Sequence, residues 1–252
     1  MAPSDGAAYA ERSISQEQQA LNQDFYRHKP QDYFSRRLTI ARSMLEDAEH
    51  SDVGTREYVA LDLELLKFHV IETMLRYFNA HVSAPNQPWQ KISGLQDRFG
   101  LTRELKSMWG VDEIDRQRMV ARVVFGVADT LSRNARVPEV RNERLQGVEE
   151  FLSHFIDYYV DRGDDERRYR ERERYNAAKH GLALVVTQDA SFGERHDVDA
   201  IGLSHLEYER TDDGGMWRLR TVWTAFDLIM MEIFRAIVLL ERIWTIGRLN
   251  IL

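Results

Sequence analysis

The chain of 252 residues contains no cysteine. Without a thiol it can form no disulfide, use no cysteine nucleophile and offer no thiolate to zinc or to an iron–sulfur cluster. It also has only five prolines and fourteen glycines, which favours long helices over a protein of short strands and turns. The net charge of −7 argues against a general polyanion-binding protein, so any contact with nucleic acid needs a local basic patch.

The sequence also lacks the pattern of a secretory signal and the pattern of a membrane-spanning segment. The start, MAPSDGAAYAERSISQEQQA, lacks the basic residues and apolar stretch of a secretory signal, and we expect a disordered or loosely packed arm over residues 1–25. The most apolar segment, TAFDLIMMEIFRAIVLL, carries Asp227, Glu232 and Arg235, which disfavours a membrane span. These features together predict a cytoplasmic protein that does not contact a membrane.

Apolar residues make up 43% of the chain, enough for a sizeable core, and most of them recur at helical spacing. Thr55 is the expected N-cap of the most apolar helix. An irregular piece containing LTRELKSMWG and a connection over residues 135–147 are expected between helices. The predicted helices cover residues 31–50, 56–82, 111–134, 148–163, 164–181 and 223–247.

After Gly181 the hydrophobic period changes from helical to alternating. LALVVT, DAIGLSHLEYER and MWRLRTVW have strand-like patterns, and TDDGG is a strong turn signal between the last two. The fold class we predict is mainly α: one helical domain over residues 26–252, with a small antiparallel β meander inserted at about 183–222, before the last helix.

The segment RYNAAKH, from Arg174 to His180, carries the residue types needed for metal-free RNA cleavage. On a helix, Asn176 and His180 stand four residues apart on one face. A histidine can transfer the proton of a 2′-hydroxyl or a leaving group, while Arg174 or Lys179 holds the phosphate. The same residues also suit the end of a surface helix, where basic side chains complement the helix dipole.

An arginine followed after four to six residues by a histidine, with a polar residue close behind the arginine, resembles the motif of the HEPN superfamily. The resemblance covers mainly residues 31–182. It implies an all-α bundle and a metal-independent endoribonuclease with no cofactor, acting as a toxin or an antiviral-defence effector. The family's polar residue usually follows the arginine directly; here Tyr175 intervenes before Asn176.

The resemblance also implies roles and partners. Arg174 and His180 become the catalytic pair, with Asn176 orienting the phosphate or the histidine and Lys179 and Tyr175 contacting the substrate. RNA is the expected substrate. Two copies of the chain are expected to dimerise across one cleft, and a regulatory protein is a further expected partner.

A second arginine–histidine pattern lies in ETMLRYFNAH, within the most apolar helix. Arg76 and His81 have the required spacing, Asn79 lies between them, and Glu72 is placed to pair with Arg76. A buried arginine held by a glutamate is more often structural than catalytic. We expect Glu72, Arg76 and His81 to line the substrate site, with Glu72 as the acidic residue that an early helix of the family contributes.

The rival interpretation is a non-catalytic helical module of the same fold that binds a nucleotide, an RNA or another protein. The intervening Tyr175 and the acidic net charge favour it. A metal site at His154 and Asp157 is a weaker alternative, since no second histidine stands at metal-ligand spacing.

Overall fold

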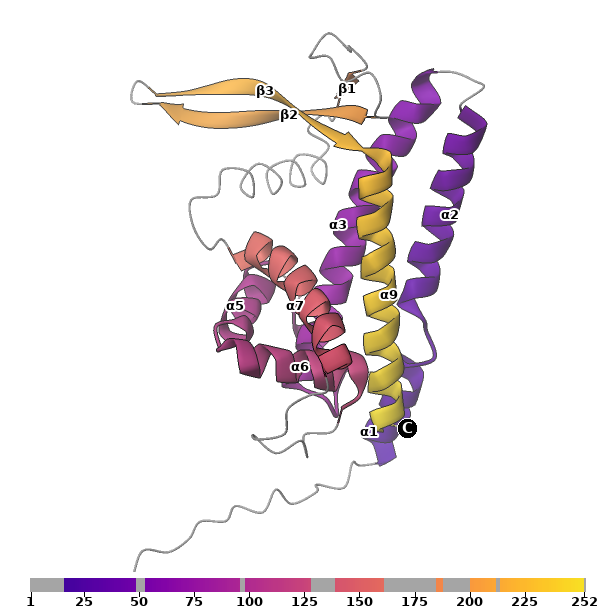
Figure 1. Ribbon diagram of the computed structural model, residues 1–252, viewed down its shortest axis with the longest axis vertical. Coiled ribbons are helices and arrows are strands. Elements are labelled where there is room, and N and C mark those ends of the chain that lie inside the picture. Colours follow the sequence, from indigo (N-terminus) through magenta and orange to yellow (C-terminus); the bar gives the residue numbers. More distant parts are fainter. Residues whose placement is uncertain are drawn as a thin grey trace, which may run out of the picture.

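The computed structural model describes residues 16–48, 53–95, 98–127, 139–160, 185–187, 200–211 and 214–251. Over these residues the protein is mainly helical. Three long helices run along its longest axis (Figure 1): α2 (Pro30–Ala48), α3 (Val53–Ser83) and α9 (Phe226–Ile251). Among the described helices, none combines the length and the apolar character needed to cross a bilayer.

Helices α3 and α9 pack against each other along most of their length and form the centre of the core. Their apolar residues recur every three or four positions, so each helix has a continuous apolar face that is stable only when it is buried. Helix α2 covers both of them along one side. The fully buried side chains of the two central helices include Leu63, Val70, Met74 and Phe78 of α3, and Ile233 and Leu240 of α9.

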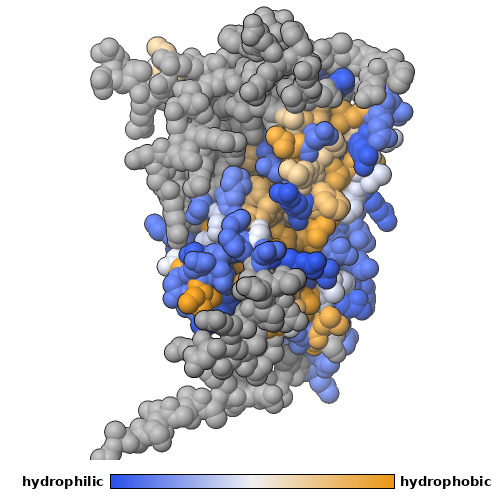
Figure 2. Space-filling model, in the orientation of Figure 1, coloured by the Kyte–Doolittle hydropathy of each residue, from blue (hydrophilic) through white to orange (hydrophobic). Residues whose placement is uncertain are grey.

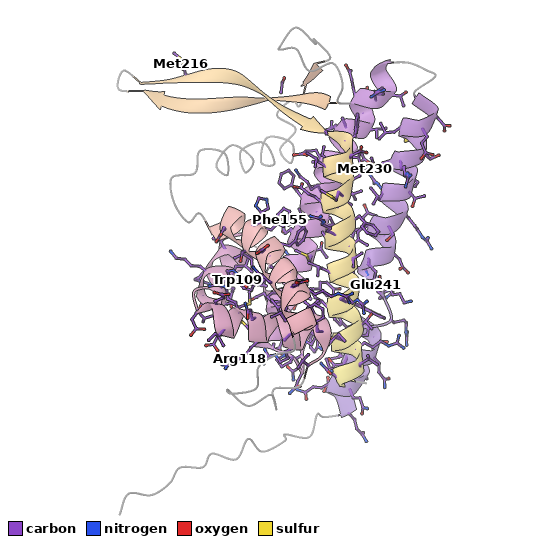
Figure 3. The ribbon with its side chains drawn as sticks, viewed as in Figure 1. Trp109, Arg118, Phe155, Met216, Met230 and Glu241 are labelled. Carbon is purple, nitrogen blue, oxygen red and sulfur yellow. The ribbon has the colours of Figure 1, made fainter. Side chains whose placement is uncertain are left out.

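Four further described helices form a second group beside α3 (Figure 1): α4 (Pro88–Gly94), α5 (Arg98–Trp109), α6 (Glu113–Phe125) and α7 (Glu139–Val160). Trp109 anchors this group. Its ring meets Phe78 edge-on with 5.8 Å between centroids, and its Nε1–H donates to Ser153 Oγ at 3.1 Å. Trp109 and Phe155, labelled in Figure 3, therefore tie α5 and α7 to the same core.

The helix boundaries differ from the predicted ones at several places, and α9 spans Phe226–Ile251 instead of 223–247. The segment expected to be irregular is helix α5, because Leu101, Leu105 and Trp109 form a buried stripe at helical spacing. Helix α7 begins at Glu139, inside the expected connection, and α6 ends at Phe125 because Gly126 adopts a left-handed φ of 65°. Helix α3 begins at Val53, so Thr55 lies inside its first turn instead of capping it.

In the described part of the chain, three strands precede the last helix: β1 (Val185–Thr187), β2 (Ala200–Thr211) and β3 (Gly214–Ala225). They pair antiparallel in the order β1-β2-β3, and the β2–β3 register runs from Ala200 opposite Ala225 to Thr211 opposite Gly214. Because β3 continues directly into α9, the hairpin extends sideways from one end of the helical body (Figure 1).

Residues 16–25, which the sequence assigned to the loose arm, form helix α1 (Gln16–Phe25). Its Asn22 is fully buried. The Asn22 side chain donates to the Asn86 carbonyl and accepts from Trp89 Nε1, both at 3.0 Å. These bonds fix α1 to the connection between α3 and α4 and to α4 itself. The rest of the predicted arm, residues 1–15, lies outside the described residues.

Candidate functional site

The first candidate site, Arg174 to His180, lies outside the described residues. This holds for Arg174, Tyr175, Asn176, Lys179 and His180 alike. The segment follows α7 in the chain and precedes β1. The predicted convergence of arginine, asparagine and histidine therefore stays a prediction.

The second candidate, on α3, is described in full, and it divides into two separate sets of contacts. Arg76 pairs with Glu72, with its Nη2 at 2.7 Å and its Nε at 3.0 Å from Glu72 Oε1. A further hydrogen bond runs from Arg76 Nη1 to the Leu95 carbonyl at the end of α4. The predicted Glu72–Arg76 pair is present within α3, and the Arg76–Leu95 hydrogen bond joins α3 to the end of α4. Both side chains are mostly buried, where a two-pronged, charge-assisted contact is stronger than at the surface.

His81 has different partners, and these define its protonation state. Its Nδ1 lies 2.7 Å from the Tyr77 carbonyl oxygen, and its Nε2 lies 2.6 Å from Tyr26 Oη. Because a carbonyl can only accept, Nδ1 carries the proton of the neutral ring, and Nε2 accepts from the Tyr26 hydroxyl. Burial lowers the pKa of His81 to about 4, against a smaller opposing effect of the hydrogen bond to Tyr77. The imidazole is therefore neutral at pH 7.

The two tyrosines beside His81 are also kept neutral. Burial raises the pKa of Tyr26 well above its usual value, and the neighbouring Tyr77 raises it further. Burial alone raises the pKa of Tyr77 to about 12. The ring of Tyr77 stacks on that of His81 with 6.1 Å between centroids. The cluster thus consists of neutral, hydrogen-bonded aromatic groups, a composition that suits a structural junction.

Helix α9 closes this cluster from the third side through Gly247. A Cβ atom at Gly247 would lie 2.2 Å from His81 Nε2 and 2.5 Å from Tyr26 Oη, so only glycine allows α9 to approach this closely. One turn earlier, Trp244 donates from Nε1 to the His28 carbonyl at 3.1 Å. His81 is left 5% exposed, enclosed by α1 and its following turn, by α3 and by α9.

The three substrate-binding residues predicted on α3 are therefore only partly brought together. Glu72 and Arg76 bind each other, whereas His81 bonds to Tyr26 and to its own helix. Asn79, between them in sequence, is buried, and its side-chain amide has no hydrogen-bond partner among the described residues. That these residues contact RNA stays a prediction.

Sequence reasoning missed a buried charge cluster between α3 and α9. Lys67 Nζ lies 3.3 Å from Glu64 Oε2 and 3.5 Å from Glu232 Oε2. Glu64 is fully buried and Lys67 nearly so. A signal was present, because two charged residues three apart within an otherwise apolar helical stripe can be buried only as a pair.

The hollow between α6 and α7 contains His154 and Asp157, the weaker metal candidate. It has a volume of about 410 Å³, and its other lining residues are Glu113, Gln146, Glu149, Glu150 and Ser153. Within the described part of the chain, no group of three histidine, aspartate or glutamate side chains is arranged to hold a metal ion. Its acidic lining repels phosphate, so this hollow is a poor place for RNA.

Comparison with known proteins adds no family assignment: no family model, no curated protein and no solved structure matches the chain.

Proposed function

We propose that the protein is a HEPN-like, metal-independent endoribonuclease that acts as a cytoplasmic toxin or antiviral-defence effector. The observation that carries the proposal is the Arg174-Tyr-Asn-Ala-Ala-Lys-His180 segment, in which Asn176 and His180 have the spacing of one helix face. The mainly helical architecture supports it. In this proposal the helices form a HEPN-like bundle, with the β meander inserted before α9.

In the proposed reaction the 2′-hydroxyl oxygen of RNA attacks the adjacent phosphorus, and the bond to the 5′-oxygen breaks. His180 accepts the 2′-hydroxyl proton, and a proton is delivered to the leaving 5′-oxygen, by His180 of a second copy or by water. Arg174 stabilises the charge that develops on the phosphate oxygens, and Asn176 and Lys179 position the phosphate. The products are a 2′,3′-cyclic phosphate and a free 5′-hydroxyl.

The α3 residues have a supporting place in this proposal. Glu72 is the acidic group contributed by an early helix, and its pairing with Arg76 fixes both side chains against α4. Tyr175 and His81 complete the proposed substrate contacts. Two copies form the active unit, and a regulatory partner restrains an activity that would otherwise damage the host's RNA.

The test is cleavage of a mixed RNA substrate in EDTA by the wild type, His180→Ala and Arg174→Ala. The control is His28→Ala, which removes an exposed imidazole far along the chain from the motif. Loss of a general acid or base lowers a rate by about 10²–10⁴-fold, so we expect the His180 and Arg174 variants to be inactive and the His28 variant to match the wild type. Mass spectrometry should find product ends one water lighter than a linear phosphate.

The alternative is a non-catalytic helical module that binds a nucleotide, an RNA or another protein chain. One described feature favours the protein-binding form: α9 exposes apolar side chains next to a groove. If purified protein cuts no RNA, and binds RNA equally well with and without His180, this alternative replaces the ribonuclease.

A further inference from the structure

Helix α9 carries a second apolar face that none of the described helices covers. Its first face packs on α2, α3 and α6. The second is a stripe of four exposed residues at spacings of three, three and four, which places them on one side of the helix. We call them the α9 stripe: Leu228, Met231, Phe234 and Val238. Phe234 is the most exposed, with 59% of its surface accessible.

A groove of about 560 Å³ lies beside the α9 stripe, between α9 and α2. Met231 and Phe234 belong both to the stripe and to the groove wall. Figure 2 shows the apolar surface over this face, bordered by hydrophilic residues, and Figure 3 labels Met230 at the same level of α9. The remaining apolar lining consists of Leu38 and Leu45 of α2, and Phe226 and Met230 of α9. Stripe and groove together form one apolar surface.

The charges around this surface fit a second copy of the same surface. Two cations, Arg42 and Arg56, and two anions, Glu46 and Asp227, line the groove, so the patch is neutral although the chain carries −7. Arg42 and Glu46 pair at 3.0 Å, and the Arg56 guanidinium lies 5.7 Å from the centre of the Phe226 ring. In a two-fold dimer each patch meets itself, so a patch of one sign would repel its copy, whereas a neutral patch with both signs does not.

The neutral lining also disfavours a small anionic ligand. A carboxylate or phosphate group entering the groove would meet Glu46 and Asp227 as well as the two arginines. Arg42 is already engaged by Glu46. An apolar surface with mixed charges at its edge is instead the composition of a helix-docking interface.

The spacing of the α9 stripe is close to symmetric about Ile233. Leu228 and Val238 lie five residues before and after it, and Met231 and Phe234 lie on either side of it. Two α9 helices that run antiparallel and cross near Ile233 therefore bring Leu228 of one copy level with Val238 of the other. The same crossing directs Phe234 of each copy toward Met231 and the groove of its partner.

We propose that the α9 stripe and its groove are the interface of a homodimer in which the α9 helices of two copies pack antiparallel. In the sequence, the α9 stripe is separate from the Arg174–His180 segment. The proposal does not depend on RNA cleavage, because a chain that cuts no RNA can still dimerise through α9.

The first test is the mass of the full chain in solution, measured by light scattering over a concentration series. The wild type should have twice the 29.6 kDa mass of one chain. Phe234→Glu should be monomeric, since it places a charge at the centre of the interface. Leu249→Glu is the matched control: Leu249 is a 72% exposed apolar residue of the same helix outside the stripe, and this variant should remain a dimer.

Each result of that series decides the question. A wild type that stays monomeric at every concentration overturns the proposal and leaves the stripe to a different protein partner. A dimer that persists in Phe234→Glu overturns it as well, because the interface must then lie elsewhere. Since Phe234 is exposed, its substitution should leave the thermal unfolding of the monomer unchanged, which separates loss of dimer from loss of fold.

The second test uses the absence of cysteine in the chain. In the antiparallel dimer, position 228 of one chain is level with position 238 of the other chain. The two 238 positions, one in each chain, are roughly 15 Å apart along the axis, because a helix rises 1.5 Å per residue. A disulfide needs Cα atoms about 4.4–6.8 Å apart. Leu228→Cys with Val238→Cys should therefore cross-link two chains under mild oxidation, and either substitution alone should not. Equal cross-linking by a single variant would contradict the antiparallel arrangement.

Discussion

Replacing Gly247 with alanine tests the packing at the end of α9 most directly. The added methyl carbon would lie 2.2 Å from His81 Nε2, 2.4 Å from His81 Cδ2 and 2.5 Å from Tyr26 Oη. Each distance is about 1 Å shorter than ordinary van der Waals contact between such atoms. The imidazole is held at both nitrogens, so it can move only by giving up a hydrogen bond, or α9 must move away from α3.

The cost can be worked out from these contacts. Overpacking a filled core costs about 1–3 kcal/mol, and leaving a buried hydrogen-bonding group without its partner costs a further 1–3 kcal/mol or so. Alanine recovers about 1 kcal/mol of helix propensity relative to glycine. The sum predicts that Gly247→Ala lowers the free energy of unfolding by about 1–5 kcal/mol.

The assay is urea unfolding followed by circular dichroism, with Gly147→Ala as the matched control. Gly147 lies inside helix α7, and a Cβ atom there would have nothing within 4 Å. The control should therefore gain up to about 1 kcal/mol from helix propensity alone. Combining Gly247→Ala with His81→Ala should remove part of the Gly247 penalty, because the imidazole is gone and Tyr26 Oη, 2.5 Å from the added carbon, gains space to move. A Gly247→Ala protein as stable as the Gly147→Ala protein would refute the close approach of α9 to His81.

Three further outcomes follow from the described contacts. The pKa of His81 is lowered on folding from 6.5 to about 4, so the unfolded chain binds more protons between these two pH values. The contribution of neutral His81 to the free energy of unfolding is therefore complete above pH 6.5 and is lost as the pH falls toward 4. At 1.36 kcal/mol per pKa unit this is about 3 kcal/mol, and urea unfolding at pH 7 and pH 5 should show a steeper loss for the wild type than for His81→Gln. Lys67→Met removes the cation beside the fully buried Glu64 and should lower the free energy of unfolding by about 3–5 kcal/mol. Adding Glu64→Leu should restore most of this loss, and thermal and urea unfolding can measure both effects. Gly126→Ala places a Cβ at a φ of 65° and 3.0 Å from Ile246 Cδ1, so it should lower stability by about 1–2 kcal/mol, whereas Gly94→Ala, with open space around its Cβ, should not.

The long helices could be predicted because their signal is local. In α3 and α9 the apolar residues recur at helical spacing over more than six turns, and that pattern determines a helix whatever it packs against. Helix α5 was missed because its stripe has only three members, Leu101, Leu105 and Trp109, within a charged segment. Its helical state depends on Trp109 being buried against Phe78 and α7, which no local pattern contains.

The enclosure of His81 could not be predicted for a related reason. The sequence placed His81 in the spacing of a catalytic motif, and that spacing is present on α3. Its surroundings come from Tyr26 and Gly247, which are far from it in the chain and reach it only because α1 and α9 pack on the same end of α3. Spacing along one helix fixes which residues share a face, but not what covers that face.

The two arginine–histidine patterns of the chain can therefore be weighed by chemistry. A general acid or base works best with a pKa near the operating pH and with access to the substrate proton. At pH 7 His81 remains neutral, because its pKa is about 4, and both of its ring nitrogens are already bonded. Arg76 is likewise engaged by Glu72 and the Leu95 carbonyl. To act on RNA, this pair would have to break the five hydrogen bonds described for Arg76 and His81 and separate α9 from α3. A more stable junction would then give a slower reaction. For that reason the ribonuclease proposal rests on Arg174 and His180, and cleavage that survives His180→Ala but is lost in a folded His81→Ala variant would return the activity to His81.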